Sequence, residues 1–131
     1  MLSYVLVFVG GGCGSVARFL CSGFFARQFG EAFPWGTLFV NVIGCFVVGV
    51  LAGLAVPEGR WMISPSVRQF LVIGFCGGYT TFSSFSLQSL TLAQGGEWSH
   101  VAANIILSIV CCFIGVWLGY VLANSSNVAA Q

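Results

Sequence analysis

Four long segments of this chain are almost entirely apolar, and they restrict its possible folds more than any other feature. They cover residues 2–25, 38–56, 67–92 and 101–123. A helix needs roughly 20 consecutive apolar residues to cross the hydrocarbon core of a bilayer. Charged residues make up only 5% of the 131 residues, which is too few to cover the surface of a soluble domain. The sequence therefore predicts a single all-α integral membrane domain with four transmembrane helices.

The segments between these spans carry the residues that favour loops and membrane interfaces. All three glutamates and all three prolines lie in them. Trp35, Trp61 and Trp98 stand at the ends of predicted spans, where interfacial aromatic residues are usual. We therefore expect the lipid bilayer to surround the apolar faces. We expect no nucleic-acid partner, because the chain contains no lysine and no basic patch.

The arginines are almost evenly divided between the two sides of the membrane. The side that holds the termini and the middle loop carries Arg60 and Arg68. The other side carries Arg27, and also Arg18 if its side chain reaches that interface. Because an excess of positive charge sets the orientation of a membrane protein, an even count lets a chain insert in both directions. Two opposed copies can then form an antiparallel, dual-topology homodimer, although the even count could also be an accident of having few charges.

The sequence GFCGGYTTFSSFS, residues 74–86, places glycines and hydroxyl side chains in the middle of the third span. Gly77 and Gly78 each weaken a helix by about 1 kcal/mol relative to alanine, and Thr80 and Thr81 are stiff β-branched residues. Irregular backbone inside a membrane is tolerated only where protein buries it or where it lines a wet cavity. We therefore predict a helix that is broken near its middle and whose free carbonyls suit a small hard cation. A continuous helix with a glycine packing face is the alternative.

Two phenylalanines follow this stretch on one face of the helix. Phe82 and Phe85 are three residues apart, and Ser83 and Ser86 form a polar line beside them. The edge of an aromatic ring is electropositive, so two ring edges could stabilise an anion weakly without trapping it. Ordinary packing of the two rings is the alternative.

The second and fourth spans each carry a stripe of small and polar residues at four-residue spacing. The members are Thr37, Asn41 and Cys45, and then Asn104, Ser108 and Cys112. Amides and hydroxyls can replace the hydration shell of a small anion, although asparagine can also simply link helices. The six cysteines have no zinc-type spacing and are predicted to be small packing residues.

No predicted span contains Asp, Glu, Lys or His. Proton-coupled and cation transport normally need an ionisable group within the membrane, which argues against a small four-span drug exporter. Arg18 is the one candidate charge, either as a structural residue near the membrane end or as an attractor of anions. The neutral, donor-rich pathway suits a small anion. A structural subunit packed by its glycines, and an enzyme that uses His100 with a cysteine, are further alternatives.

Three motifs resemble the Fluc/CrcB family of bacterial fluoride channels. They are GGGCGSVARF at residues 10–19, GTLFVNVIG at residues 36–44 and GFCGGYTTFSSFS at residues 74–86. The length and the four-span layout are also similar, so the resemblance covers essentially the whole chain. It implies a fluoride-selective channel, not an enzyme, that exports fluoride passively across the bacterial cytoplasmic membrane. It also implies an antiparallel homodimer with two pores.

The resemblance further implies roles for individual residues. A sodium ion at the dimer centre would be held by the main-chain carbonyls of Gly77 and Thr80. Arg18 matches the arginine of the family's first span, with a structural or electrostatic role. The implied fluoride pathway contains Asn41, Thr81, Phe82, Ser83, Ser84, Phe85, Asn104 and Ser108. The chain departs from the family at Gln88, where many members have glutamate, and at Cys112, where serine is more usual.

Overall fold

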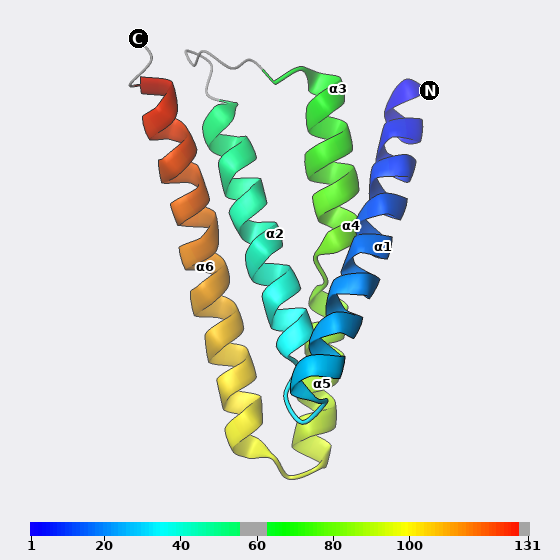
Figure 1. Cartoon of the computed structure of the whole chain (residues 1–131), viewed down its shortest axis with the longest axis vertical. Helices are drawn as coiled ribbons and strands as arrows, with labels where there is room; N and C mark the ends of the chain where they lie inside the picture. Colours follow the sequence, from blue (N-terminus) through cyan, green and yellow to red (C-terminus); the bar gives the residue numbers. More distant parts are fainter. Residues whose placement is uncertain (56–62, 129–131) are drawn as a thin grey trace.

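The computed structural model describes residues 1–55 and 63–128, and every regular element within them is helical. The elements in chain order are α1 (Leu2–Phe29), α2 (Trp35–Leu54), α3 (Pro65–Arg68), the π-helical η1 (Gln69–Cys76), α4 (Gly77–Tyr79), α5 (Phe82–Gln94) and α6 (Trp98–Val128). They make up four long helical stretches. Figure 1 shows these running alternately up and down, with the start of α1 and the end of α6 at the same end. The stretches provide the scaffold on which the polar residues are placed.

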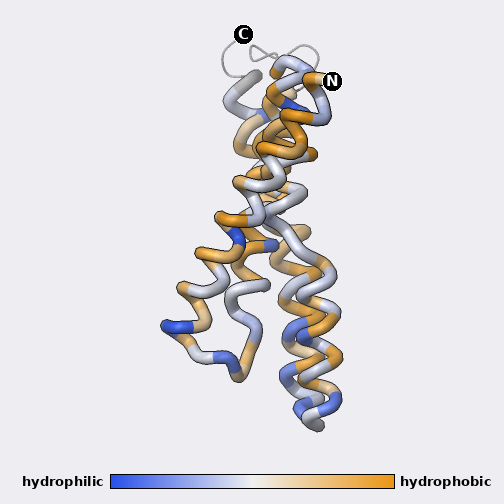
Figure 2. The backbone as a smooth tube through the Cα atoms, turned by 90° about the vertical axis from the view of Figure 1, so that its right-hand side faces the viewer, coloured by the Kyte–Doolittle hydropathy of each residue, from blue (hydrophilic) through white to orange (hydrophobic). Residues whose placement is uncertain are grey.

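Four helical stretches are long and apolar enough to cross a membrane. They are Leu2–Phe29, Trp35–Leu54, Pro65–Gln94 and Trp98–Ser126. The predictions of an all-α chain and of four helices that can span a membrane are therefore confirmed. Orange predominates along the tube in Figure 2, as expected of helices that face lipid. The chain is a multi-pass membrane protein.

The helices extend beyond the predicted spans at most of their ends. α1 continues to Phe29 and α6 to Val128, because an apolar window marks only the hydrocarbon part of a helix that can continue through the interface. Trp35 and Trp98 are the first residues of α2 and α6, in agreement with a role at the interface. The residues of the middle loop used in the predictions lie outside the described part of the chain, namely Val56, Pro57, Glu58, Arg60 and Trp61.

Close contact between backbones holds the helices in two pairs, α2 with α6 and α1 with η1 and α4. A Cβ atom built on Gly49 would overlap the carbonyl oxygen of Val116, and one on Gly14 would overlap that of Phe75. Small residues let helices approach closely in a membrane, where van der Waals contact replaces the hydrophobic effect as the main attraction between helices. The glycines at four-residue spacing therefore fix both helix pairs.

The third span contains a short non-helical junction between α4 and α5. Gly77 and Gly78 stay helical, whereas Thr80 (φ −78°, ψ 156°) and Thr81 (φ −152°, ψ 112°) have extended backbone conformations. The role of Gly78 is to let the third span approach α1 closely, because a Cβ atom there would overlap the carbonyl oxygen of Gly11. The stiff threonines, rather than the glycines, are thus the residues at which the helical conformation is interrupted.

Candidate functional site

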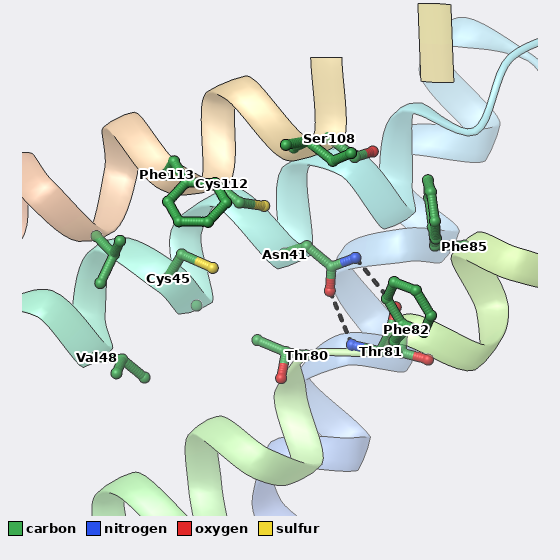
Figure 3. Close-up of a pocket in the computed structure, with 13 residues that line it drawn as sticks. Asn41, Cys45, Val48, Thr80, Thr81, Phe82, Phe85, Ser108, Cys112 and Phe113 are labelled. Carbon is green, nitrogen blue, oxygen red and sulfur yellow. Dashed lines mark hydrogen bonds between the residues drawn. The ribbon is translucent and has the colours of Figure 1, made fainter. Parts of the chain in front are cut away.

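A cavity of about 440 Å³ lies between α2, α6 and the junction of α4 with α5 (Figure 3). Its lining combines amide, hydroxyl and thiol groups with aromatic and aliphatic side chains. None of its described lining residues is Asp, Glu, His, Lys or Arg. The cavity brings together six residues that were predicted to form sites, namely Asn41, Thr80, Thr81, Phe82, Phe85 and Ser108.

Asn41 links α2 to the junction of the third span. Its Oδ1 accepts a hydrogen bond from the Thr81 N–H at 2.8 Å, and its Nδ2 donates to the Thr81 carbonyl at 3.0 Å, as Figure 3 shows. The side-chain amide therefore satisfies both backbone groups of one extended residue, as a neighbouring strand would. A primary amide has two N–H groups, and this pairing uses one of them. Asn41 thus fixes the junction and can still offer a donor to the cavity that it lines.

Thr81 is the N-cap residue of α5 and is buried. Its Oγ1 accepts a hydrogen bond from the Ser84 N–H at 3.2 Å, which makes it a side-chain N-cap. The same hydroxyl donates to Ser84 Oγ at 3.0 Å and lies 3.2 Å from Ser83 Oγ. The hydroxyls of Thr81, Ser83 and Ser84 therefore cluster at the positive end of the α5 dipole. Of the three residues, only Thr81 lines the cavity.

These contacts redirect two backbone donors away from the third span's own carbonyls. In a continuous α-helix the Thr81 N–H would bond to the Gly77 carbonyl, and the Ser84 N–H to the Thr80 carbonyl. Here the Thr81 N–H donates to Asn41 and the Ser84 N–H donates to Thr81 Oγ1. Main-chain carbonyl oxygens are hard ligands of the kind that small hard cations prefer. The two carbonyls that the family resemblance assigns to sodium therefore fit that ion chemically.

Phe82 and Phe85 stand side by side at the start of α5. Their ring centroids are 5.2 Å apart with planes at 42°, and both rings line the cavity. Phe82 is 78% exposed. The pair can present ring edges to the cavity, where an anion would meet positive partial charge.

A chain of hydrogen bonds connects α6 to α5 beside this cavity. Ser108 donates to Asn104 Oδ1 at 3.5 Å, Asn104 Nδ2 donates to Ser89 Oγ at 2.9 Å, and Ser89 donates to the Phe85 carbonyl at 2.9 Å. Asn104 is completely buried, and it does not line the cavity, whereas Ser108 does. In the fourth-span stripe, Ser108 therefore contributes its hydroxyl to the cavity, and Asn104 contributes its amide to the contact between α6 and α5.

Three other sequence positions of interest lie away from this cavity. Arg18 is a partly exposed residue of α1. Gln88 lines a second cavity, of about 520 Å³, and its Oε1 is buried without a hydrogen-bond partner among the described residues. Buried Thr37, the first member of the second-span stripe, lines the same second cavity.

Comparison with known proteins agrees with these features. The family described as "CrcB-like protein, Camphor Resistance (CrcB)" matches residues 5–120. The chain belongs to the CrcB family. The family resemblance drawn from the three motifs is thereby confirmed.

Three curated relatives are similar to this chain over nearly its full length and over nearly their own. A protein of Rhodospirillum rubrum is 53% identical over 126 residues, which are 96% of this chain and 98% of the relative. One from Opitutus terrae is 47% identical over 127 residues, which are 97% of this chain and 96% of the relative. One from Methylocella silvestris is 47% identical over 126 residues, or 96% of each. All three are named "Fluoride-specific ion channel FluC", which is a class of ion channel rather than of enzyme.

Ser89 is a polar residue of this CrcB-family chain that was not predicted to belong to the site. Ser89 is the hydrogen-bond partner of Asn104 and connects it to the Phe85 carbonyl. Ser89 follows Phe85 by four residues, and this helical spacing is the sequence signal that places both on one face.

Proposed function

We propose that this protein is a fluoride-selective ion channel that exports fluoride passively across the bacterial cytoplasmic membrane and so protects the cell from fluoride. Membership of the CrcB family, the names of the relatives and the four spans support this function. The observation that carries the proposal is the lining of the 440 Å³ cavity. It combines an amide, a hydroxyl and a ring pair without a charged side chain among its described residues.

This lining suits the chemistry of a small anion. A fluoride ion that leaves water loses strong hydration, so hydrogen-bond donors must replace its hydration shell. The second N–H of Asn41 supplies such a donor, and the Ser108 hydroxyl can supply another by giving up its long 3.5 Å bond to Asn104 Oδ1. The edges of Phe82 and Phe85 supply weaker positive charge. Without a fixed counter-charge the ion can leave the site as readily as it enters. Ser83, Ser84 and Asn104 extend the proposed pathway beyond the cavity.

The membrane potential is a sufficient driving force for export. Hydrogen fluoride is a weak acid that crosses membranes as a neutral molecule and ionises inside the cell, so fluoride accumulates there. An inside-negative potential drives an anion outward with about 2.3 kcal/mol per charge per 100 mV. A selective pore therefore needs no other energy source.

We further propose that two copies inserted in opposite orientations form the channel, with a sodium ion at the centre of the dimer. The even division of the arginines supports the double orientation. The redirected donors near Gly77 and Thr80 support the ion, because they release carbonyl oxygens at a discontinuity of the third span. When bound, sodium would offset the partial negative charge of these carbonyls.

Fluoride efflux from liposomes that hold the purified protein tests the proposed function. A fluoride electrode should record rapid loss of fluoride, and a chloride electrode should record none. The efflux should be lost in Asn41→Ala but kept in Phe8→Ile, because Phe8 is an exposed residue of α1 that does not line the cavity. If folded protein releases no fluoride, the channel proposal is wrong, and a structural role for the polar stripes becomes the better explanation.

A further inference from the structure

Two thiols line the cavity, and the proposed channel does not require either of them. Cys45 follows Asn41 by one turn of α2, and Cys112 follows Ser108 by one turn of α6. Figure 3 shows both sulfur atoms directed into the space between the two helices. Both cysteines are free thiols. The cavity therefore contains a facing pair of thiols.

The backbone around this pair is held at a fixed spacing. A Cβ atom on Gly49 would overlap the Val116 carbonyl, and one on Gly119 would overlap the Phe46 carbonyl. These contacts lie in the turns beside the two cysteines, so they hold the backbones that carry the thiols close together. A rigid pair of ligands loses little conformational entropy when it binds an ion.

We propose that Cys45 and Cys112 form a binding site for a two-coordinate soft metal ion, with the mercuric ion as its preferred occupant. Thiolate sulfur selects soft metals. On binding, each S–H bond is replaced by an S–Hg bond, and two protons leave to solvent. The product is a neutral bis-thiolate. Silver or cuprous ion would instead leave one net negative charge in an apolar cavity, where an uncompensated charge is costly.

The site differs from a structural zinc site and from the carbonyls of the third-span junction. Zinc takes four protein ligands in structural sites. Residues 1–55 and 63–128 contain no group of three or more His, Cys, Asp or Glu placed to hold a metal ion. Cys111 precedes Cys112 but is not among the residues that line the cavity. The carbonyls of Gly77 and Thr80 offer hard oxygen atoms, which a soft ion binds poorly.

Metal retention against a competing thiol tests the site without relying on channel activity. Purified protein would receive one equivalent of mercuric chloride and then be dialysed against excess glutathione. We expect one mercury per chain, with two sulfur neighbours by X-ray absorption spectroscopy. Cys45→Ser and Cys112→Ser should each lower retention at least about tenfold, because a single thiolate lacks the effective concentration that a second one provides. Cys13→Ser and Cys111→Ser are matched controls that should retain the metal.

Three results would overturn the proposal: unchanged retention in both Cys45→Ser and Cys112→Ser, loss of the metal in Cys111→Ser, or a single sulfur neighbour. Gel filtration of each variant shows whether its fold is intact. Fluoride efflux provides a separate readout, which rests on the proposed function. Mercury should block efflux in the unmodified protein but not in Cys112→Ser. Efflux that continues while mercury stays bound to two sulfurs would support the metal site and count against the cavity as the fluoride pathway.

Discussion

The side-chain amide of Asn41 pairs with both the N–H and the carbonyl of Thr81, at 2.8 Å and 3.0 Å. This two-point contact joins the second span to the one irregular stretch of the third. Thr81 in turn caps α5, whose first turn holds Phe82 and Phe85. One asparagine therefore positions both the donors and the rings of the cavity.

Replacement of Asn41 by alanine should lower stability as well as fluoride efflux. The change removes two hydrogen bonds and leaves two backbone groups of Thr81 unpaired, which we expect to cost about 2–4 kcal/mol. Thermal unfolding in detergent and the liposome assay measure the two effects. Asn41→Asp is the control, because its side chain keeps an oxygen that can accept from the Thr81 N–H, so it should lose less stability than the alanine variant. Wild-type stability in the alanine variant would show that the pairing contributes little.

Two glycines in the middle of long helices should respond differently to alanine. Gly49→Ala places a Cβ atom on the Val116 carbonyl and should destabilise the protein by about 1–3 kcal/mol through overpacking. Gly12→Ala meets no heavy atom within 4 Å, and the better helix propensity of alanine should leave stability equal or slightly higher. Unfolding midpoints of the two variants check this order. Equal effects would contradict the close approach of α2 and α6.

The contact between Asn104 and Ser89 should appear as a coupling energy. Each residue is changed to alanine alone and both are changed together, and the free energies of unfolding are compared as a double-mutant cycle. We expect a coupling of about 0.6 kcal/mol, which is typical of hydrogen bonds between membrane helices. A coupling of zero would mean that α5 and α6 do not depend on this bond.

Phe82 and Phe8 are matched in exposure, at 78% and 82%, but only Phe82 lines the cavity. Phe82→Ile should lower fluoride efflux at least about tenfold, a change of roughly 1.4 kcal/mol in barrier height. Phe8→Ile should leave efflux unchanged. Both variants should keep the unfolding temperature of the parent. Equal efflux from the two variants would exclude a role for the Phe82 ring in permeation.

The hydroxyl of Thr81 should influence the sodium that we propose at the junction. Thr81→Val removes the acceptor of the Ser84 N–H, which is then free to bond to the Thr80 carbonyl. We expect the sodium concentration needed for half-maximal efflux to rise about tenfold, equivalent to roughly 1.4 kcal/mol. Thr81→Ser keeps the hydroxyl and should keep the parent value. Efflux that is independent of sodium in all three proteins would argue against the ion.

The number of spans could be predicted from the sequence, because each apolar segment is long enough to cross a bilayer by itself. The residues of the junction could be predicted only approximately. Gly77 and Gly78 are adjacent residues of low helix propensity near the middle of the third span. They remain helical because Gly78 packs against the backbone of Gly11, a tertiary contact that local propensity does not contain.

The stripes of the second and fourth spans show the same limit at the site. Four-residue spacing places Asn41 near Cys45 and Ser108 near Cys112, and all four line one cavity. Asn104 belongs to the same stripe, yet its amide turns to Ser89. A residue of the stripe contacts a neighbouring helix where that neighbour runs beside it, and lines the cavity where the neighbour has ended. Sequence spacing within a single helix does not specify this.

Residue 41 leaves the ribosome forty residues before its partner at position 81. At about 5–20 residues per second, the second span waits roughly 2–8 s for the backbone groups that its asparagine will bind. During this interval a strongly polar amide lies in a hydrophobic segment without its native partner, so the translocon, water or lipid head groups must accommodate it. The Asn41–Thr81 pair can therefore form only after the middle of the third span has been synthesised. Any change that slows synthesis of the third span lengthens the exposure of the second.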